Sequence, residues 1–182
     1  RTIPVIEAID GGIEGLAGGT DSATAVGGMK SKIEAAKIVV RSGIPLVIAC
    51  TGHAVAGGAL VVLTGDVRIA AAGAYRIGLN EVAIGLPVPV LAMELARDRL
   101  QPAALTRATL LAHIHTPEEA LAAGYVDELA PPDQVLPRAL AEATRLAALG
   151  RKPFVATKQR LRGRTIAHIS STLEQDLREL LA

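Results

Sequence analysis

A short apolar run, a glycine-rich turn and a second apolar run follow one another between residues 44 and 65. The first run, Ile44-Pro45-Leu46-Val47-Ile48-Ala49-Cys50, is rich in β-branched residues and is bounded by glycines, which is typical of a buried strand. The small residues from Ala54 to Ala59 then lead into Leu60-Val61-Val62-Leu63, which predicts a helix. A strand that turns directly into a helix favours an α/β fold.

The turn before this helix has the composition of an anion-binding site. The first N–H groups of a helix have no partner inside the helix, so they bind developing negative charge. Gly57 and Gly58 have no side chains and allow a substrate carbonyl to approach the backbone, as an oxyanion hole requires. Tight packing of helix against strand is the alternative interpretation, because Gly-Gly before an apolar segment is common.

A carboxylate, Glu81, follows about twenty residues later within Ile77-Gly78-Leu79-Asn80-Glu81-Val82-Ala83-Ile84-Gly85-Leu86. Its apolar neighbours disfavour the ionised form, which predicts a raised pKa and a role in proton transfer. A surface or ion-paired glutamate is the alternative. The turn and Glu81 together are the candidate catalytic site.

Four sequence blocks carry a resemblance to a known family. They are Pro45–Ala59, Asp66–Ala71, Gly78–Leu86 and Thr116–Glu128. Over about residues 44–161 the chain resembles the enoyl-CoA hydratase/isomerase family, also called the crotonase superfamily. The resemblance implies that Gly57 donates one oxyanion N–H, that Glu81 is the catalytic glutamate and that the substrate is an acyl-CoA thioester, with coenzyme A part of that substrate and no separate cofactor.

The implied fold is α/β, a crotonase-like layered sheet with helices and a mainly helical C-terminal third. We expect one domain over residues 1–182, with an atypical segment at 1–43, a core at 44–130 and a helical region at 131–182. Local sequence patterns predict alternating strands and helices. Strands are expected at 4–8, 44–50, 67–71 and 75–79, and helices at 29–42, 56–63, 89–97, 102–111, 117–123, 132–149 and 170–181.

One departure from the family pattern affects the expected chemistry. Family hydratases carry a second glutamate three residues beyond the oxyanion glycine, and Leu60 stands there in this chain. Moving a double bond can use a single base, whereas hydration needs one carboxylate for the water and another for the substrate proton. Isomerisation is therefore favoured over hydration, with Leu60, Gly58 and His53 expected near the substrate.

The front of the chain departs further. The family's second oxyanion donor has no intact counterpart, and Gly18 or Gly19 is the nearest candidate. Residues 13–48 instead resemble a fragment of the amino acid kinase family, particularly glutamate kinase, with Lys32 at a nucleotide-phosphate position. A plain amphipathic helix is the alternative for that segment.

Two partial resemblances leave three hypotheses open. The first is an acyl-CoA enzyme that uses Gly57 and Glu81. The second is a recombined or designed α/β chain that keeps the fold without a full site. The third is a nucleotide-binding module that uses Gly27, Gly28, Lys30 and Lys32.

The C-terminal third combines amphipathic helix patterns with a basic run. Apolar side chains that can face a core or a partner recur at Leu136, Leu140, Ala143, Ala147 and Leu161. In the family such tails build trimers, so a homo-oligomer, a trimer or hexamer, is expected. Six basic residues lie between Arg151 and Arg164, and Lys158 best matches the family's lysine for the phosphates of coenzyme A. A solvated basic face is the alternative.

Composition excludes several other classes of function. With 182 residues and 50% hydrophobic content, the chain can bury a core without disulfides or metals. A formal net charge of +1 and few aromatic residues argue against a nucleic-acid partner. Glycines interrupt the uncharged stretch 44–65, so no membrane span is expected. No metal site is predicted, Cys50 is expected to be a buried small hydrophobe, and without a recognisable signal peptide the cytoplasm is the default location.

Overall fold

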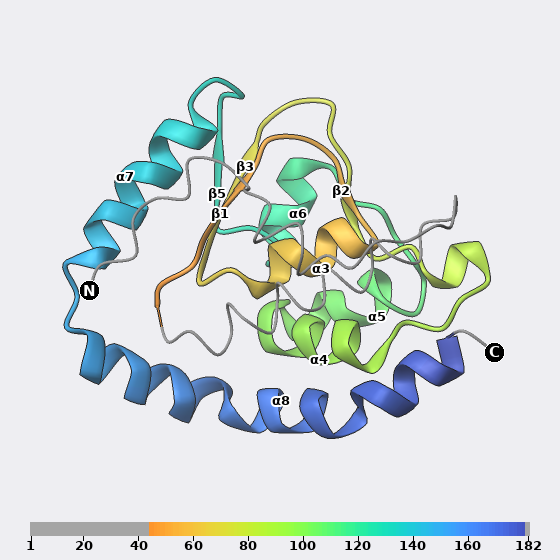
Figure 1. Cartoon of the computed structure of the whole chain (residues 1–182). Coiled ribbons are helices and arrows are strands. Elements are labelled where there is room, and N and C mark those ends of the chain that lie inside the picture. The colour runs from red at the N-terminus through yellow and green to blue at the C-terminus, as the bar shows by residue number, and fades with distance from the viewer. Residues whose placement is uncertain (1–43, 181–182) are drawn as a thin grey trace, which may run out of the picture.

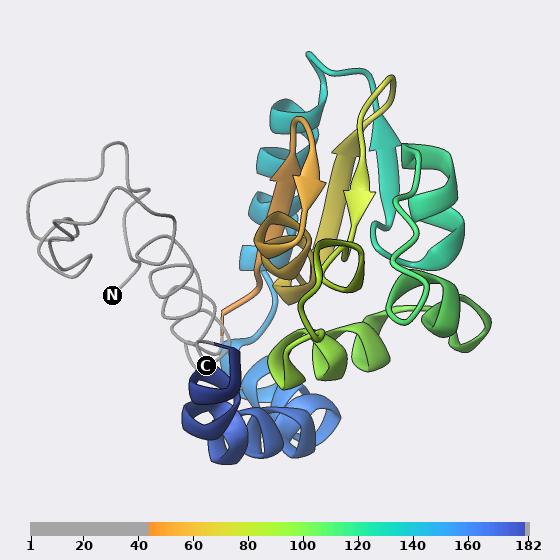
Figure 2. The same ribbon diagram turned by 90° about the vertical axis from the view of Figure 1, so that its right-hand side faces the viewer.

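Two small parallel sheets form the centre of the fold in the computed structural model, which describes residues 44–180. The first has three strands in the order β1–β3–β5, namely Val47–Cys50, Val67–Ala71 and Glu128–Ala130. The second pairs β2, Ala54–Val55, with β4, Ile77–Gly78. Figure 2 shows the two sheets as successive layers. This arrangement confirms the expected crotonase-like layered α/β fold.

Alternation along the strands divides the core between the two faces of the three-stranded sheet. On one face, Ile69 and Ala71 of β3 pack with Val135 and Ala139 of α7. On the other face, Ala70 joins a larger cluster with Leu60 and Leu63 of α3 and residues of α4. Successive side chains of a strand point to opposite faces, so a strand buried on both sides is apolar at nearly every position.

Helices cover these faces and extend the fold at its C-terminal side. Their bounds are α3 Gly57–Thr64, α4 Val90–Arg99, α5 Leu105–Ala108, α6 Pro117–Ala123, α7 Val135–Ala147 and α8 Arg151–Leu180, with 3₁₀ turns η1 Val82–Ile84 and η2 Pro102–Ala104. Helix α7 lies against the three-stranded sheet, and the long helix α8 runs along α4 (Figure 1). The mainly helical C-terminal third is confirmed.

Local signals explain why α6 begins and ends where it does. Thr116 accepts a hydrogen bond from the backbone N–H of Glu119, whose side chain accepts one from the Thr116 N–H, and Pro117 occupies the first turn. Gly124 ends the helix with φ +89°, and a Cβ there would lie 2.9 Å from the carbonyl oxygen of Arg99. Both the left-handed backbone and the close contact require glycine.

Other predicted bounds are corrected. The strand expected at 44–50 begins at Val47, and the helix expected at 102–111 ends at Ala108, after which Leu110 and Leu111 are exposed. The helix expected at 170–181 begins already at Arg151. Strand β2 was not predicted, because a strand of two residues has no periodicity to detect.

The leucines of α7 and α8 that were predicted to face a core or a partner do not face the core of this chain. Leu136 and Leu140 are exposed, as is Leu161 of α8, and the buried side of α7 is formed by Val135, Ala139 and Leu146. The helix is therefore rotated relative to the expected core face. A partner on the exposed leucines stays a prediction.

Two further expectations concern single features. Cys50 is a buried free thiol whose pKa is raised by desolvation, which confirms its assignment as a small core residue. Within residues 44–180, none of the helices combines the length and apolar character needed to cross a lipid bilayer.

Candidate active site

Pairing of β2 with β4 brings the glycine-rich turn and Glu81 to the same edge of the small sheet. The strands are parallel, with Ala54 opposite Ile77 and Val55 opposite Gly78. The backbone N–H of Ala56 donates to the carbonyl of Gly78 at 3.0 Å and extends this pairing by one residue. Because parallel strands end at the same edge, the start of α3 and the segment that holds Glu81 emerge side by side.

The turn presents free backbone donors. The first hydrogen bond of α3 runs from the Leu60 N–H to the Ala56 carbonyl at 3.1 Å. The N–H groups of Gly57, Gly58 and Ala59 have no acceptor among the described residues. Unpaired N–H groups at a helix start stabilise an anion, which is the requirement for an oxyanion hole.

Backbone strain accompanies this geometry at Ala56. Its φ of 51° and ψ of −119° lie in a region that residues with a Cβ rarely adopt. Such strain costs on the order of 1–3 kcal/mol and is concentrated at functional sites.

Relief of this strain gives a stability prediction. Ala56→Gly is expected to raise the free energy of unfolding by about 1 kcal/mol in urea titrations, because glycine adopts this backbone without steric cost. Ala59→Gly, inside α3, is the matched control and should lower it by about 1 kcal/mol or more. Equal destabilisation by both substitutions would show that Ala56 is not strained.

Glu81 is held by the turn that follows it and is almost fully buried. Its carbonyl accepts hydrogen bonds from the N–H groups of Ile84 at 3.0 Å and Leu86 at 2.9 Å, which fixes the backbone. The residue is 5% exposed, and its Oε2 atom has no hydrogen-bond partner among the described residues. Desolvation raises its pKa, with a smaller opposing effect from its own backbone N–H. The interpretation of Glu81 as a surface or ion-paired residue is therefore wrong.

The glycine and leucine positions of α3 differ in their surroundings. Leu60 is buried in the main core cluster, so no carboxylate occupies the position at which hydratases carry their second glutamate. A Cβ added to Gly58 would lie 3.7 Å from the Cβ of Ala54, an ordinary contact. Packing against Ala54 therefore does not require a glycine at position 58.

His53 lies at the other end of β2 from the candidate oxyanion turn. Its Nδ1 accepts a hydrogen bond from the Arg76 N–H at 3.0 Å, and its ring meets that of Tyr75 edge to face at 5.7 Å between centroids. The side chain is exposed. Contact of His53 with substrate stays a prediction.

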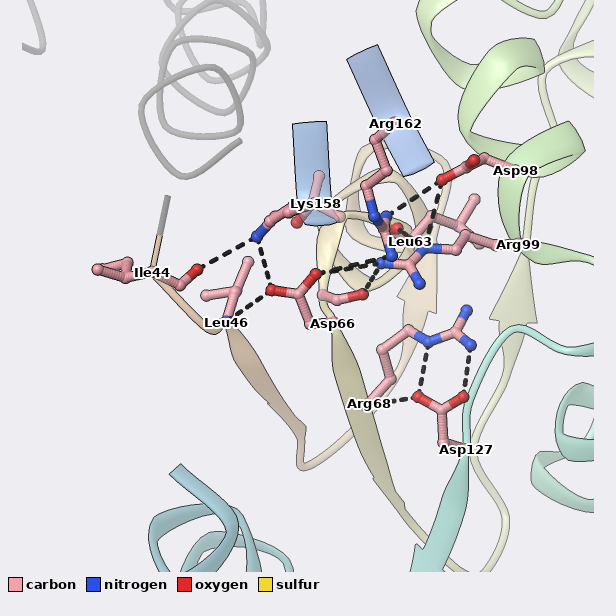
Figure 3. Close-up of polar contacts among 12 residues, drawn as sticks. Ile44, Leu46, Leu63, Asp66, Arg68, Asp98, Arg99, Asp127, Lys158 and Arg162 are labelled. Carbon is pink, nitrogen blue, oxygen red and sulfur yellow. Dashed lines mark hydrogen bonds and ion pairs between the residues drawn. The ribbon is translucent and has the colours of Figure 1, made fainter. Parts of the chain in front are cut away.

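Lys158 is not a surface cation. It is 8% exposed, and its Nζ donates to Asp66 Oδ2 at 2.6 Å and to the Ile44 carbonyl at 3.2 Å (Figure 3). Arg162 is also buried, with one guanidinium nitrogen 3.6 Å from Asp66 and another 3.1 Å from Asp98. The expectation that Lys158 reaches the phosphates of coenzyme A is corrected, because its ammonium group is already paired inside the protein.

These residues form what we call the Asp66 cluster: Asp66, Asp98, Arg99, Lys158 and Arg162. It joins the start of β3 to α4 and α8 (Figure 3). The Leu46 N–H also donates to Asp66 at 2.9 Å. Burial and the neighbouring cations lower the pKa of Arg99 to about 10, which Asp98 and Asp66 partly oppose. The alternative of a solvated basic face holds only for Arg151, Lys152, Arg160 and Arg164, which are exposed.

Two buried aromatic residues, His115 and Tyr125, were not identified as site residues from the sequence. His115 forms an antiparallel bridge with Ile77, and its ring lies 5.1 Å from that of Tyr125 between centroids. Burial and the neighbouring His113 lower the pKa of His115. No sequence spacing signals this group, because the chain brings it to β4 through long-range contacts. Among residues 44–180, no set of three or more His, Cys, Asp or Glu side chains is placed to hold a metal.

Several sequence-based candidates lie outside the described residues. They are the second oxyanion candidates Gly18 and Gly19 and the nucleotide-binding candidates Gly27, Gly28, Lys30 and Lys32. Their roles stay predictions.

Comparison with known proteins identifies the family. The sequence model of the enoyl-CoA hydratase/isomerase family matches residues 3–180, and the chain belongs to this family. The match also covers most of the N-terminal segment 1–43 that was expected to be atypical.

Relatives include both hydratases and isomerases by name. The human mitochondrial enoyl-CoA delta isomerase 1 is 32% identical over 143 residues, which cover 78% of this chain and 47% of that protein. A crystal structure of an enoyl-CoA hydratase from Mycobacterium marinum is 38% identical with a TM-score of 0.78, covering 85% of this chain and 69% of the other. The human mitochondrial delta3-delta2-enoyl-CoA isomerase structure is 31% identical with a TM-score of 0.78, covering 90% and 64%. The chain spans about half the length of the curated isomerases it matches.

A second likeness is confined to a short stretch. Glutamate 5-kinase of Carboxydothermus hydrogenoformans is 55% identical over 49 residues, which cover 27% of this chain and 13% of the kinase. A recombined or designed origin stays a hypothesis.

Proposed function

We propose that this chain carries the catalytic site of an enoyl-CoA isomerase, acting on an acyl-CoA thioester. The observation that supports this most is the parallel pairing of β2 with β4, since the free N–H groups at the start of α3 and the buried Glu81 both follow these strands at one sheet edge. One edge then offers both an anion-stabilising group and a general base, the two requirements for enolate chemistry.

The proposed reaction needs one carboxylate. Ionised Glu81 removes a proton from the carbon between the thioester carbonyl and the double bond of a 3-enoyl-CoA. The electron pair moves into a dienolate, whose oxygen charge is stabilised by the N–H of Gly57 and a second backbone donor. Glu81 then returns the proton to carbon 4, which leaves the double bond between carbons 2 and 3.

Leu60 supports isomerisation over hydration. Hydration needs a second group to position and activate water, and the core side chain at this position has no acid or base function. Exposed Val82, Ile84 and Leu86 directly after Glu81 offer apolar contacts to an acyl chain or to another protomer. A homo-oligomer and a cytoplasmic location remain part of this proposal.

A product analysis tests the proposal. We expect the protein to convert a 3-enoyl-CoA to the conjugated 2-enoyl-CoA, followed by the ultraviolet absorbance of the conjugated thioester and by chromatography. A 2-enoyl-CoA offered alone should give little 3-hydroxyacyl-CoA. Rapid hydration of that substrate would contradict the isomerase assignment, and a folded protein inactive on both would favour the scaffold hypothesis.

A further inference from the structure

Several polar side-chain atoms in the segment of Glu81 and in neighbouring segments are buried without hydrogen bonds. Among the described residues, five side-chain atoms are buried without a partner: Asn80 Oδ1, Glu81 Oε2, His115 Nδ1, the Tyr125 hydroxyl and Arg162 Nε. Buried polar atoms are nearly always paired, so each exception calls for an explanation. Arg162 belongs to the Asp66 cluster, whereas the other four atoms belong to neighbouring segments, which indicates a shared cause.

The backbone brings these segments together. Ile77 and His115 exchange two hydrogen bonds, at 3.0 and 2.9 Å, which fixes the residues after α5 against β4. A Cβ added to Gly78 would lie 3.0 Å from the carbonyl oxygen of His113, so the two chains are in close contact. Glu81 follows β4 by three residues and therefore leaves the sheet next to this bridge.

Tyr125 is held rigidly beside the same bridge. Its side chain is fully buried, its N–H donates to the Ala120 carbonyl at 2.8 Å, and its ring lies 5.1 Å from that of His115. Two residues later, Asp127 forms a bidentate pair with Arg68, with contacts of 2.9 and 2.6 Å (Figure 3). The position of the ring is thus fixed on both sides.

The charge of Glu81 acts on the Tyr125 hydroxyl. Burial raises the pKa of the phenol, the nearby Leu79 N–H lowers it, and the Glu81 charge raises it, with a result of about 12. The hydroxyl therefore stays a neutral donor at all working pH values. The Tyr125 hydroxyl is thus a buried donor without an acceptor, and Glu81 Oε2 is a buried carboxylate oxygen without a donor.

On the basis of the proposed function, we propose that Tyr125 is a positioning residue for Glu81. Its hydroxyl donates a hydrogen bond to Oε2 when Glu81 carries the negative charge that removes the substrate proton. A side-chain movement on ionisation makes this bond, which stabilises the charged base and fixes its orientation.

The other titratable groups around this pair do not supply the same effect. Burial and His113 lower the pKa of His115, which disfavours a positive charge on its ring. His113, Glu119 and Arg107 interact with one another towards the surface. A neutral His115 ring still carries one N–H, but Glu81 is not among the groups that shift the pKa of His115, whereas it does shift the pKa of Tyr125. We therefore assign the donor role to the Tyr125 hydroxyl.

Tyr125→Phe tests this role by a titration of Glu81 itself. Glutamate labelled with ¹³C at the side-chain carboxyl would be followed by NMR in the full chain, with the Glu81 signal assigned by its loss in Glu81→Gln. Loss of a hydrogen bond to the charged form should raise the pKa of Glu81 by about one unit. At a pH low enough to keep Glu81 protonated, the melting temperature should be unchanged or higher, since the deleted hydroxyl then has no partner.

The chain offers a matched control because it has only two tyrosines, Tyr75 and Tyr125. Tyr75→Phe should leave the pKa of Glu81 unchanged. In that background, replacement of tyrosine by 3-fluorotyrosine modifies Tyr125 alone and makes its hydroxyl a stronger donor, so the pKa of Glu81 should fall. This second variant keeps the test valid if Tyr125→Phe does not fold.

The outcomes separate the two proposals. An unchanged or lowered Glu81 pKa in folded Tyr125→Phe, or no decrease with 3-fluorotyrosine, would overturn the positioning role. A shifted pKa in a protein that does not act on enoyl-CoA would retain that role and overturn the proposed function.

Discussion

Asp66→Asn is expected to lower the free energy of unfolding by about 3–5 kcal/mol, the cost of removing one partner from a buried ion pair. The Asp66 side chain is 15% exposed, and it faces Lys158, Arg162 and Arg99 at 2.6, 3.6 and 4.0 Å. Without its charge, the buried cations of α8 and α4 keep, among the described residues, only Asp98 as a nearby acid. Urea unfolding followed by circular dichroism measures the loss.

A surface pair on α8 provides the control. Glu174 and Arg178 lie 3.5 Å apart with side chains 91% and 81% exposed, so Glu174→Gln should change stability by less than about 0.5 kcal/mol. Adding Lys158→Met to Asp66→Asn should restore part of the loss, because one unpaired charge is removed. An Asp66→Asn variant as stable as Glu174→Gln would show that the cluster does not hold α8 to the sheet.

Glu81→Gln is expected to lower proton transfer at the substrate carbon by about 10²–10⁴-fold, the usual contribution of a general base. Glutamine keeps the size of the side chain but cannot take a proton. Rates at saturating enoyl-CoA measure the loss. Glu118→Gln, at an exposed position in α6, is the control and should retain activity.

The same substitution should stabilise the protein at neutral pH. Desolvation raises the pKa of Glu81 in the folded state, so the folded state favours the protonated form. The resulting stabilisation is fully present at a pH below the ordinary glutamate pKa of 4.5, and it is lost as the pH rises through the pKa of Glu81 in the folded state. Glu81→Gln should therefore exceed the wild type in melting temperature at pH 7, and the difference should shrink towards pH 4. A wild type that is more stable at pH 7 would contradict the desolvation account.

Sequence patterns predicted the elements whose signals are local. Strand β3 and helix α6 have the predicted bounds because each is marked by its own residues, an apolar run in β3 and a capping box with a terminal glycine in α6. Helix α8 was predicted too short, because its first half carries few apolar residues and is stabilised by the Asp66 cluster instead. Such long-range pairing leaves no periodic signal in the sequence.

The residues of the candidate site also fall into two groups, those with a local sequence signal and those positioned by long-range contacts. Glu81 and the Gly57 turn were identified from motifs, and the structure adds that they leave one sheet edge together. The placement of Lys158 was wrong because its partner, Asp66, lies 92 residues away in sequence. Tyr125 and His115 were missed for the same reason, since only the fold brings His115 to Ile77 of β4 and Tyr125 against His115.

Proton exchange in heavy water tests the central claim most directly. The protein would be incubated with a short enoyl-CoA, and loss of the substrate's carbon-bound protons would be followed by NMR, alongside Glu81→Gln. We predict exchange in the wild type that is lost in Glu81→Gln, as enolate chemistry at this carboxylate requires. Absence of exchange in a folded wild-type protein, or equal exchange in both, would contradict the assignment of Glu81 as the catalytic base.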